Sequence, residues 1–457
     1  FLDDSMNVIE GKSWNTSWAA GVPGTVAGFG MAHEKFGSVN WKKLVRPAAG
    51  LAKNGFPIDF QNKMAINHPY YQKYLTNDVE AEKIFSRLEP IELNELFYQK
   101  DLGITLDRIS ISGWQEFYTG KTADMIEKCM QRTEGLITKE DLKKYQPIER
   151  EPITFHYRGY EVHSMPPASS GGVAIAGILN QIENIHLDSL NYHSTQHIHY
   201  VSEVERRVYA DRAEFMGDMD FVPVPIDELI SDKYAKMRWN SVDSLNATSS
   251  TDITHGNIPF DYRESEETTH YSVVDKWGNA VSVTTTINGW FGNGIVVDGA
   301  GFLLNNEMDD FSAKPDVPNA YGLIGNTANA IEPRKRMLSS MSPTIVETDE
   351  GILFLVIGSP GGSTIITTTA QIIMNVIDFG MDIEDAVETP RFHHQWLPDV
   401  IQIEERGFSY ETIHELEAMG HRIILRGSIG EANCIQVEGG YMFGAADSRR
   451  NSSAVGY

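Results

Sequence analysis

The alternation of apolar and polar residues is clearest in two neighbouring stretches of the chain. Residues 270–275 mix β-branched and aromatic side chains, and residues 281–286 alternate apolar with hydroxyl side chains. Both patterns are typical of β-strands. The four residues between Asp275 and Ala280 read Lys-Trp-Gly-Asn, which is a turn sequence. We therefore expect a β-hairpin with Thr268 at the entrance to its first strand.

A long polar segment, residues 246–267, leads into this hairpin. A structureless loop of that length inside a compact protein is either functional or disordered. Cleavage between Glu267 and Thr268 would give Thr268 a free α-amine, whose pKa near ~8 suits removal of the hydroxyl proton at neutral pH. The residues alone leave two interpretations open: an N-terminal nucleophile, and a threonine at the solvated start of a strand, where threonine is common.

Helical spacing of apolar residues dominates the first third of the chain, and mixed patterns follow. Helices are expected over residues 42–54, 61–73, 93–102, 122–131, 173–185, 195–215 and 364–378, with a helix start at Thr138. Strands are expected within residues 153–165, 295–304, 352–357, 400–404, 422–426 and 435–444. Strands flanked by helices on both sides predict a layered α/β fold.

The composition and charge of the chain argue against some classes of function. The 457 residues are 41% hydrophobic and 22% charged, as in ordinary soluble globular proteins. The 63 acidic against 38 basic residues argue against a nucleic-acid partner, because binding a phosphate backbone needs a basic face. No apolar run approaches the ~20 residues of a membrane-spanning helix. Cys129 and Cys434 lie in neither metal nor redox spacings, and we expect them to be free thiols.

Two further sets of candidate residues have simpler explanations. Ser169 and Ser170 precede an expected helix without a Gly-x-Ser-x-Gly elbow, so we expect them to cap that helix. His197 and His199 lie two apart in an expected helix and should point to different faces, which argues against a shared metal ion. The sequence therefore predicts neither a serine-hydrolase elbow nor a metal site.

Four motifs occur in a fixed order in the second half of the chain. They are TTHYSV at 268–273, LLNNEMDDF at 303–311, LSSMSPT at 338–344 and GSPGGS at 358–363. In this order and spacing they resemble the γ-glutamyltransferases (γ-glutamyl transpeptidases) of the N-terminal-nucleophile hydrolase superfamily, over Ala19 to Tyr457. The resemblance implies a four-layer αββα fold and autocatalytic cleavage between Glu267 and Thr268. A large subunit (1–267) and a small subunit (268–457) would then form one intertwined heterodimer.

The resemblance also implies a role for each residue of the site. Thr268 would be the nucleophile, Thr286 would orient it, and Gly361 and Gly362 would form the oxyanion hole. The substrate-binding residues it implies are Asn288, Glu307 and Asp310 for the α-ammonium, Ser339 and Ser340 for the α-carboxylate, and Tyr321 in a loop that closes over the site.

The activity implied is γ-glutamyl transfer and hydrolysis through a γ-glutamyl-Thr268 ester, with neither metal nor organic cofactor. Donors would be glutathione and other γ-glutamyl amides, and acceptors would be amino acids, dipeptides or water. Family habit implies a periplasmic or secreted location. The alternatives are a related cephalosporin or glutaryl acylase, a γ-polyglutamate transpeptidase, and an uncleaved non-catalytic homologue. Asn288, Glu307 and the Ser339-Ser340 pair favour recognition of a free glutamyl group.

Two departures from the family pattern stand out. The arginine that binds the α-carboxylate in the family lies upstream of Ala19, so we expect this chain to lack it, together with upstream core strands. Ser448 stands where the family usually has proline.

Overall fold

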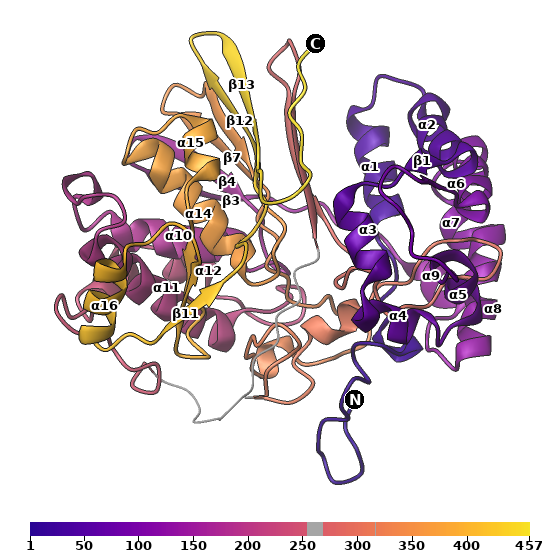
Figure 1. Ribbon diagram of the computed structural model, residues 1–457, viewed down its shortest axis with the longest axis horizontal. Helices are drawn as coiled ribbons and strands as arrows, with labels where there is room; N and C mark the ends of the chain where they lie inside the picture. The colour runs from indigo at the N-terminus through magenta and orange to yellow at the C-terminus, as the bar shows by residue number, and fades with distance from the viewer. Residues whose placement is uncertain (254–267, 316) are drawn as a thin grey trace. The chain divides into compact units, whose positions relative to one another are not determined.

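The computed structural model describes residues 1–253, 268–315 and 317–457 (Figure 1). Glu267 lies outside the described residues, so the expected division of the chain at the Glu267-Thr268 bond stays a prediction. No helix in the described ranges combines the length and the hydropathy needed to cross a membrane.

The chain forms two compact units. Unit 1 comprises residues 1–150 and 286–309, and unit 2 comprises residues 151–285 and 310–457.

Unit 1 is mostly helical, as the sequence predicts. Its elements are η1 (Ser17–Ala19), α1 (Thr25–Phe36), α2 (Trp41–Asn54), β1 (Phe56–Pro57), α3 (Phe60–Asn67), α4 (Pro69–Leu75), α5 (Val79–Phe85), β2 (Leu96–Phe97), α6 (Lys100–Ser112), α7 (Glu116–Thr119), α8 (Lys121–Thr133) and α9 (Lys139–Lys144). Thr138 caps α9 in a reciprocal capping box with Asp141, which confirms the predicted helix start.

Three predicted elements of unit 1 are wrong. The helix expected over 61–73 is two helices, because Pro69 cannot continue α3 and instead begins α4. The helix expected over residues 93–102 is also wrong. These residues contain strand β2, which pairs with β1, and helix α6 begins only at Lys100. Residues 295–304 form a single bridge rather than a strand, since Gly299 and Gly301 turn the chain at φ +68° and +77°.

Apolar side chains of the 286–309 segment hold it within unit 1. Val297 and Leu304 join the core of α6, α8 and α9, and Phe291 and Val296 join a second core beneath α3 to α5. The loop that carries Asn288 and Glu307 is therefore fixed at both ends by buried residues.

Unit 2 is built on a six-stranded antiparallel sheet in the order β13-β12-β8-β7-β4-β3. The strands are β3 (Ile153–Tyr157), β4 (Tyr160–Ser164), β7 (Thr344–Thr348), β8 (Leu353–Ile357), β12 (Asn433–Glu438) and β13 (Tyr441–Ala446). The helices are α10 (Gly171–Ile182), α11 (Thr195–Phe215), α12 (Ile226–Leu229), α13 (Asp232–Trp239), α14 (Thr364–Ile377), α15 (Ile383–Glu388) and α16 (Tyr410–Ala418).

A smaller sheet completes unit 2. Its order is β11-β10-β9, from β9 (Phe392–His393), β10 (Ile401–Glu404) and β11 (Ile423–Arg426). Short 3-10 turns of unit 2 are η2 (Leu187–Ser189) and η4 (Thr327–Asn329), and η3 (Glu307–Asp310) begins in unit 1 and ends at the first residue of the second segment of unit 2. Cys129 in unit 1 and Cys434 in unit 2 are buried free thiols, as expected.

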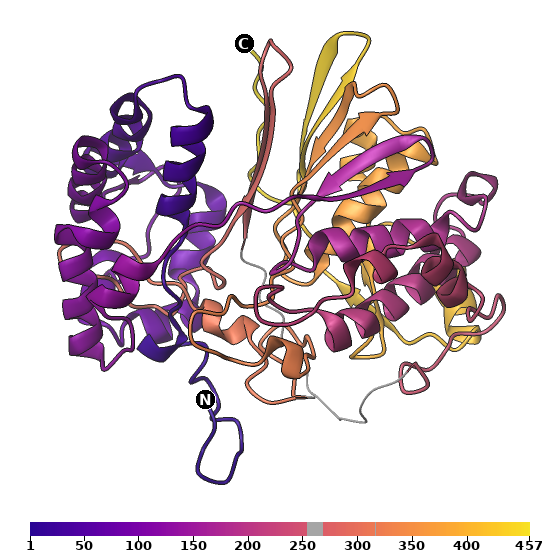
Figure 2. The ribbon, with the colours of Figure 1, turned by 180° about the vertical axis from the view of Figure 1, so that it is seen from behind.

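The predicted hairpin is confirmed and lies in unit 2. Strand β5 (Thr269–Val274) pairs with β6 (Ala280–Thr285), in a register that sets Thr269 opposite Thr285. Figures 1 and 2 show the hairpin along one face of the large sheet, with α14 and α15 along the other. Helices, sheet and hairpin are thus successive layers of one α/β unit, and the predicted α/β class is confirmed.

Serine hydroxyls fasten the hairpin to the sheet. Ser272 Oγ contacts the carbonyl oxygens of Val356 at 3.2 Å and Asn433 at 2.8 Å. Ser282 Oγ donates to Ile357 O at 2.9 Å and accepts from Thr344 N at 3.1 Å. Since these hydroxyls are short, the two layers meet closely at this point.

The ring of His270 covers Gly358, the residue that follows β8. Its Nδ1 bonds to Thr284 Oγ1 at 2.9 Å, and burial lowers its pKa to about 4, so the ring is neutral at physiological pH. A Cβ at Gly358 would lie 2.3 Å from the ring carbon Cε1. This contact therefore requires glycine at position 358.

We predict that Gly358→Ala destabilises the protein by about 1–3 kcal/mol, because the added methyl overpacks the His270 contact. Urea unfolding measures the effect. The control is Gly28→Ala, which adds the same methyl in α1 where nothing lies within 4 Å; it should leave stability unchanged or raise it. Adding His270→Ala to Gly358→Ala should restore part of the loss. An unchanged unfolding midpoint for Gly358→Ala would contradict the account.

Candidate functional site

The predicted site residues divide between the two units. Thr286, Asn288 and Glu307 belong to unit 1. Those of unit 2 are Thr268, Asp310, Tyr321, Ser339, Ser340, Gly361 and Gly362.

Thr268 is half-buried and directly precedes β5. Because Thr269 pairs with Thr285, Thr268 and Thr286 are the next residues of their two strands at the open end of the hairpin. Two residues on from Thr268, the His270 carbonyl accepts from Asn433 Nδ2 at 3.3 Å. The start of β5 is thereby held against the large sheet.

The turn after Gly358 brings backbone N–H groups to the beginning of α14. Gly361 has φ +136° and Gly362 has φ +54°, and a Cβ at Gly361 would lie 2.5 Å from Thr364 Oγ1. Both conformations favour glycine. Thr364 closes the turn through its N–H and Oγ1, which donate to Gly361 O at 2.9 and 2.8 Å. Within the described ranges, the N–H groups of Gly361 and Gly362 donate no hydrogen bond.

Gln395 connects this turn to the loop that carries Tyr321. Its Oε1 accepts from Ser363 Oγ at 2.8 Å and contacts His393 Nε2 at 2.9 Å. Its Nε2 donates to Tyr321 O at 3.2 Å, and Tyr321 is itself 4% exposed. Sequence reasoning missed Gln395; the available signal was a polar His-His-Gln run between the buried aromatics of residues 392 and 396.

Ser169 and Ser170 hold the Ser339-Ser340 turn. Both were expected to cap α10, and this expectation is wrong for Ser170. Ser170 is the N-cap of α10, but its side chain makes no capping bond. Its N–H and its Oγ both donate to Ser339 O at 2.8 Å. Ser169 Oγ donates to Met341 O at 2.7 Å. The pair therefore clamps the neighbouring turn.

Both hydroxyls of this turn keep a proton to donate. Ser339 Oγ accepts from Met341 N at 3.1 Å, and Ser340 Oγ accepts from Arg212 Nη2 at 3.2 Å. Neither hydroxyl donates to another residue in the described part of the chain. A hydroxyl has one proton and two lone pairs, so each serine can still donate to an anion.

In unit 1, Asn306 fixes the backbone around Asn288. Asn288 is buried at φ +69°, and its N–H donates to Thr286 Oγ1 at 2.8 Å. Asn288 Nδ2 donates to Asn306 O at 3.0 Å. The Asn306 side chain accepts from Gly289 N at 2.8 Å and donates to Trp14 O at 3.1 Å. This one side chain ties the Asn288 loop to the N-terminal segment.

Asn305 ties the backbone at Glu307 to the N-terminal segment in a similar way. Its Oδ1 accepts from Gly21 N at 2.8 Å and from Glu307 N at 3.1 Å, and its Nδ2 donates to Gly21 O at 2.9 Å. Burial raises the pKa of the Glu307 carboxyl to about 7. Sequence reasoning gave Asn305 and Asn306 no role, although both stand inside a quoted motif.

Two groups of described side chains have the composition of a cation site. They are His199, Glu203 and His421, and Glu161, His163 and Glu347. In the first group, Glu203 Oε2 already accepts from Arg207 Nη1 and Thr248 Oγ1, each at 2.6 Å. His199 Nδ1 lies 2.7 Å from His421 Nε2. Glu203 is thus satisfied by the protein. As predicted, His197 points elsewhere, against Phe379.

Comparisons with known proteins identify the family of this chain. The family model described as "Gamma-glutamyltranspeptidase" matches residues 2–457. The glutathione hydrolase proenzyme of Escherichia coli (strain K12) is 47% identical over 453 residues, which cover 98% of this chain and 77% of that protein.

Two solved structures are also similar. The cephalosporin acylase from Bacillus halodurans superposes with a TM-score of 0.82 at 23% identity, over 95% of this chain and 78% of that one, a likeness of fold. The γ-glutamyltranspeptidase of Helicobacter pylori superposes with a TM-score of 0.54 at 39% identity, over 56% of this chain and 73% of that one. On the extent of the family match and of the identity, the chain belongs to the γ-glutamyltranspeptidase family.

Proposed function

We propose that the protein is a γ-glutamyltransferase and glutathione hydrolase that is activated by cleavage between Glu267 and Thr268. The observation that carries this proposal is the pairing of two features of unit 2. Thr268 stands at the start of an anchored hairpin, and the adjacent turn has two N–H groups that donate to none of the described residues. A nucleophile and an oxyanion-binding pair are the two parts that acyl transfer requires.

The same residues support a complete acyl-transfer cycle. The α-amine of Thr268 would take the proton of its own hydroxyl, and Oγ would attack the γ-carbonyl of the donor. The oxyanion would accept hydrogen bonds from the N–H groups of Gly361 and Gly362. The C–N bond then breaks, the leaving amine takes the proton, and water or an acceptor amine resolves the ester. Thr286 would orient the nucleophile.

Recognition of the glutamyl group follows from charge. The free protons of the Ser339 and Ser340 hydroxyls suit the α-carboxylate, and Glu307 and Asp310, with the Asn288 amide, suit the α-ammonium. Donors would be glutathione and similar γ-glutamyl amides, and acceptors would be amino acids, dipeptides or water. The loop of Tyr321 would close over the bound donor.

Two further features follow from the relatives. The E. coli and H. pylori proteins are bacterial, and the E. coli relative is named a proenzyme. We propose that this chain is likewise processed into two subunits that remain associated, and that it acts in the periplasm or outside the cell.

We predict that the purified protein releases p-nitroaniline from γ-glutamyl-p-nitroanilide and that Thr268→Ala abolishes the release, because this substitution removes the hydroxyl that would form the ester. Absorbance of the released aniline gives the rate. The matched control is Thr269→Ala, which changes the neighbouring, exposed threonine and should keep most of the activity. No release from the γ-glutamyl donor, with release from a glutaryl or cephalosporin amide, would favour the acylase alternative instead.

The raised pKa of Glu307 predicts the pH dependence of donor binding. With a pKa of about 7, this carboxyl is mostly neutral at pH 6 and mostly ionised at pH 8. Because only the ionised form attracts the α-ammonium, KM for the γ-glutamyl anilide should fall as pH rises from about 6 to 8. In Glu307→Gln, KM should depend less on pH. The rate constant kcat should still rise once, near pH ~8, as the Thr268 α-amine loses its proton and can act as the base. A KM profile unchanged by Glu307→Gln would contradict the assigned role.

A further inference from the structure

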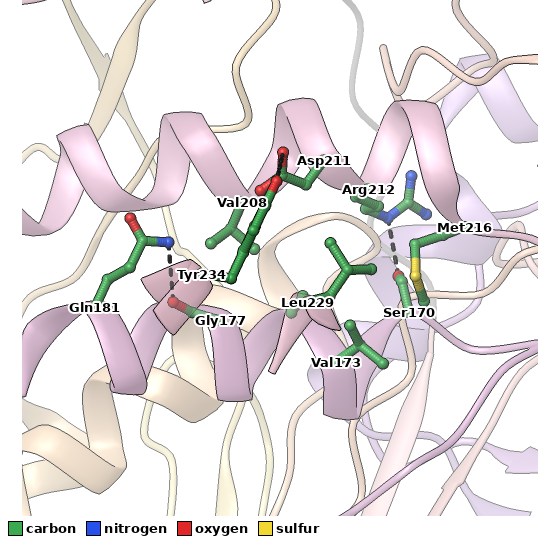
Figure 3. A pocket seen from close by; sticks show the side chains of 11 residues that line it. Ser170, Val173, Gly177, Gln181, Val208, Asp211, Arg212, Met216, Leu229 and Tyr234 are labelled. Carbon is green, nitrogen blue, oxygen red and sulfur yellow. Dashed lines mark hydrogen bonds between the residues drawn. The ribbon is translucent and has the colours of Figure 1, made fainter. Parts of the chain in front are cut away.

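A buried arginine lies directly behind the Ser339-Ser340 turn. Arg212, near the end of α11, is 5% exposed. Its Nε donates to Ser170 Oγ at 2.9 Å (Figure 3). Its Nη2 donates to Ser340 Oγ at 3.2 Å. One guanidinium therefore contacts both the serine of the turn and the serine that clamps it.

Among the described residues, Arg212 has no ion-pair partner. Two other buried arginines of α11 have carboxylate partners: Arg206 pairs with Glu203 and Asp399, and Arg207 pairs with Glu203. No carboxylate in the described part of the chain lies within ion-pair distance of Arg212, whose hydrogen-bond partners are neutral hydroxyls. A buried cation without a counter-ion is costly to the fold unless an anion reaches it.

The surroundings of Arg212 keep its charge effective. It lines one end of a small pocket between α10 and α11 whose walls include Val173, Met216 and Leu229 (Figure 3). Burial lowers the pKa of the guanidinium, and the charge of Asp310 opposes that effect. Gln181 and Asp211 also line this pocket, but in such buried surroundings a charge acts over a longer distance than it does in water.

The hydrogen bonds give this charge a direction. Ser170 Oγ accepts from Arg212 and donates to Ser339 O at 2.8 Å, so its orientation is fixed. Ser340 Oγ accepts from Arg212, which turns its own proton away from the guanidinium. The open, donating side of the turn is therefore positively polarised.

We propose that Arg212 is a positioning residue for the substrate's α-carboxylate: it orients the Ser339-Ser340 hydroxyls and supplies positive potential behind them. The proposal rests on the proposed γ-glutamyl transfer and adds the group that sets selectivity for a carboxylate. Arg212 does not touch the reacting atoms, so it acts on donor binding rather than on the chemical step.

Three donors with the same leaving group distinguish an effect on α-carboxylate binding from a general loss of activity. γ-Glutamyl-p-nitroanilide has both α-groups, glutaryl-p-nitroanilide lacks the ammonium, and 4-aminobutyryl-p-nitroanilide lacks the carboxylate. For Arg212→Gln, we expect kcat/KM to fall about 10- to 100-fold with the first two donors, mostly through KM, and to change little with the third. Arg212→Lys should recover part of the loss, since it keeps the charge but not the fork of donors.

The matched control is Arg238→Gln. Arg238, on α13, is a half-buried arginine that pairs with Asp211 of α11, so its replacement tests the loss of an arginine packed against the same helix without touching the serines. Arg238→Gln should leave the relative kcat/KM values of the three donors unchanged. If Arg212→Gln does not fold, Ser170→Ala removes the Nε partner and should shift the same ratio against the carboxylate donors.

The outcomes separate this inference from the proposed function. An equal fall with all three donors, or with none, overturns the role of Arg212 while leaving γ-glutamyl transfer intact. A wild-type protein that does not use the γ-glutamyl donor overturns the proposed function, and the inference with it. Loss confined to the two carboxylate donors, with partial rescue by lysine, supports the assignment.

Discussion

The hydrogen bonds from hairpin serines to the backbone of the large sheet are the constraint on which the rest of the site depends. Packed sheets usually meet through interleaved apolar side chains, about 10 Å apart. Here Ser272 and Ser282 reach the carbonyls at the ends of β8 and β12 directly. The start of the hairpin, and Thr268 with it, is thus fixed relative to the turn that follows β8. Geometry of this kind supports acyl transfer, because small misplacements of a nucleophile are costly.

Short polar side chains do the same work elsewhere. Asn305 and Asn306 hold the Asn288 and Glu307 loops of unit 1 to its N-terminal segment, and Ser169 and Ser170 hold the Ser339-Ser340 turn of unit 2. Gln395 links the glycine turn to the Tyr321 loop. In each case a side chain satisfies backbone groups that an irregular loop would leave unpaired. These hydrogen bonds fix the backbone path of the loops that carry the candidate site.

Much of this could be predicted from the sequence, where local patterns decide the outcome. The alternation of apolar and polar residues on both sides of the turn at Gly278 predicted the hairpin, and the four motifs predicted the family. Both predictions are confirmed. Prediction failed where tertiary contacts override pattern, as at residues 295–304, where glycines with positive φ break a strand-like run. Arg212 was missed because a charged residue in a helix is usually solvated, and burial is not visible in one sequence. Ser448, noted only as a departure from proline, uses the N–H that proline lacks to donate to Glu388 Oε1 at 2.8 Å.

The account requires that Thr268 become the first residue of a new chain. Intact-mass measurement of the purified, active protein, with N-terminal sequencing of its fragments, tests this most directly. We expect two fragments, one of which begins Thr-Thr-His-Tyr, and a single uncut chain for Thr268→Ala. Turnover by a preparation in which Thr268 is still joined to Glu267 would contradict the account, and would favour a protein that does not use an N-terminal nucleophile.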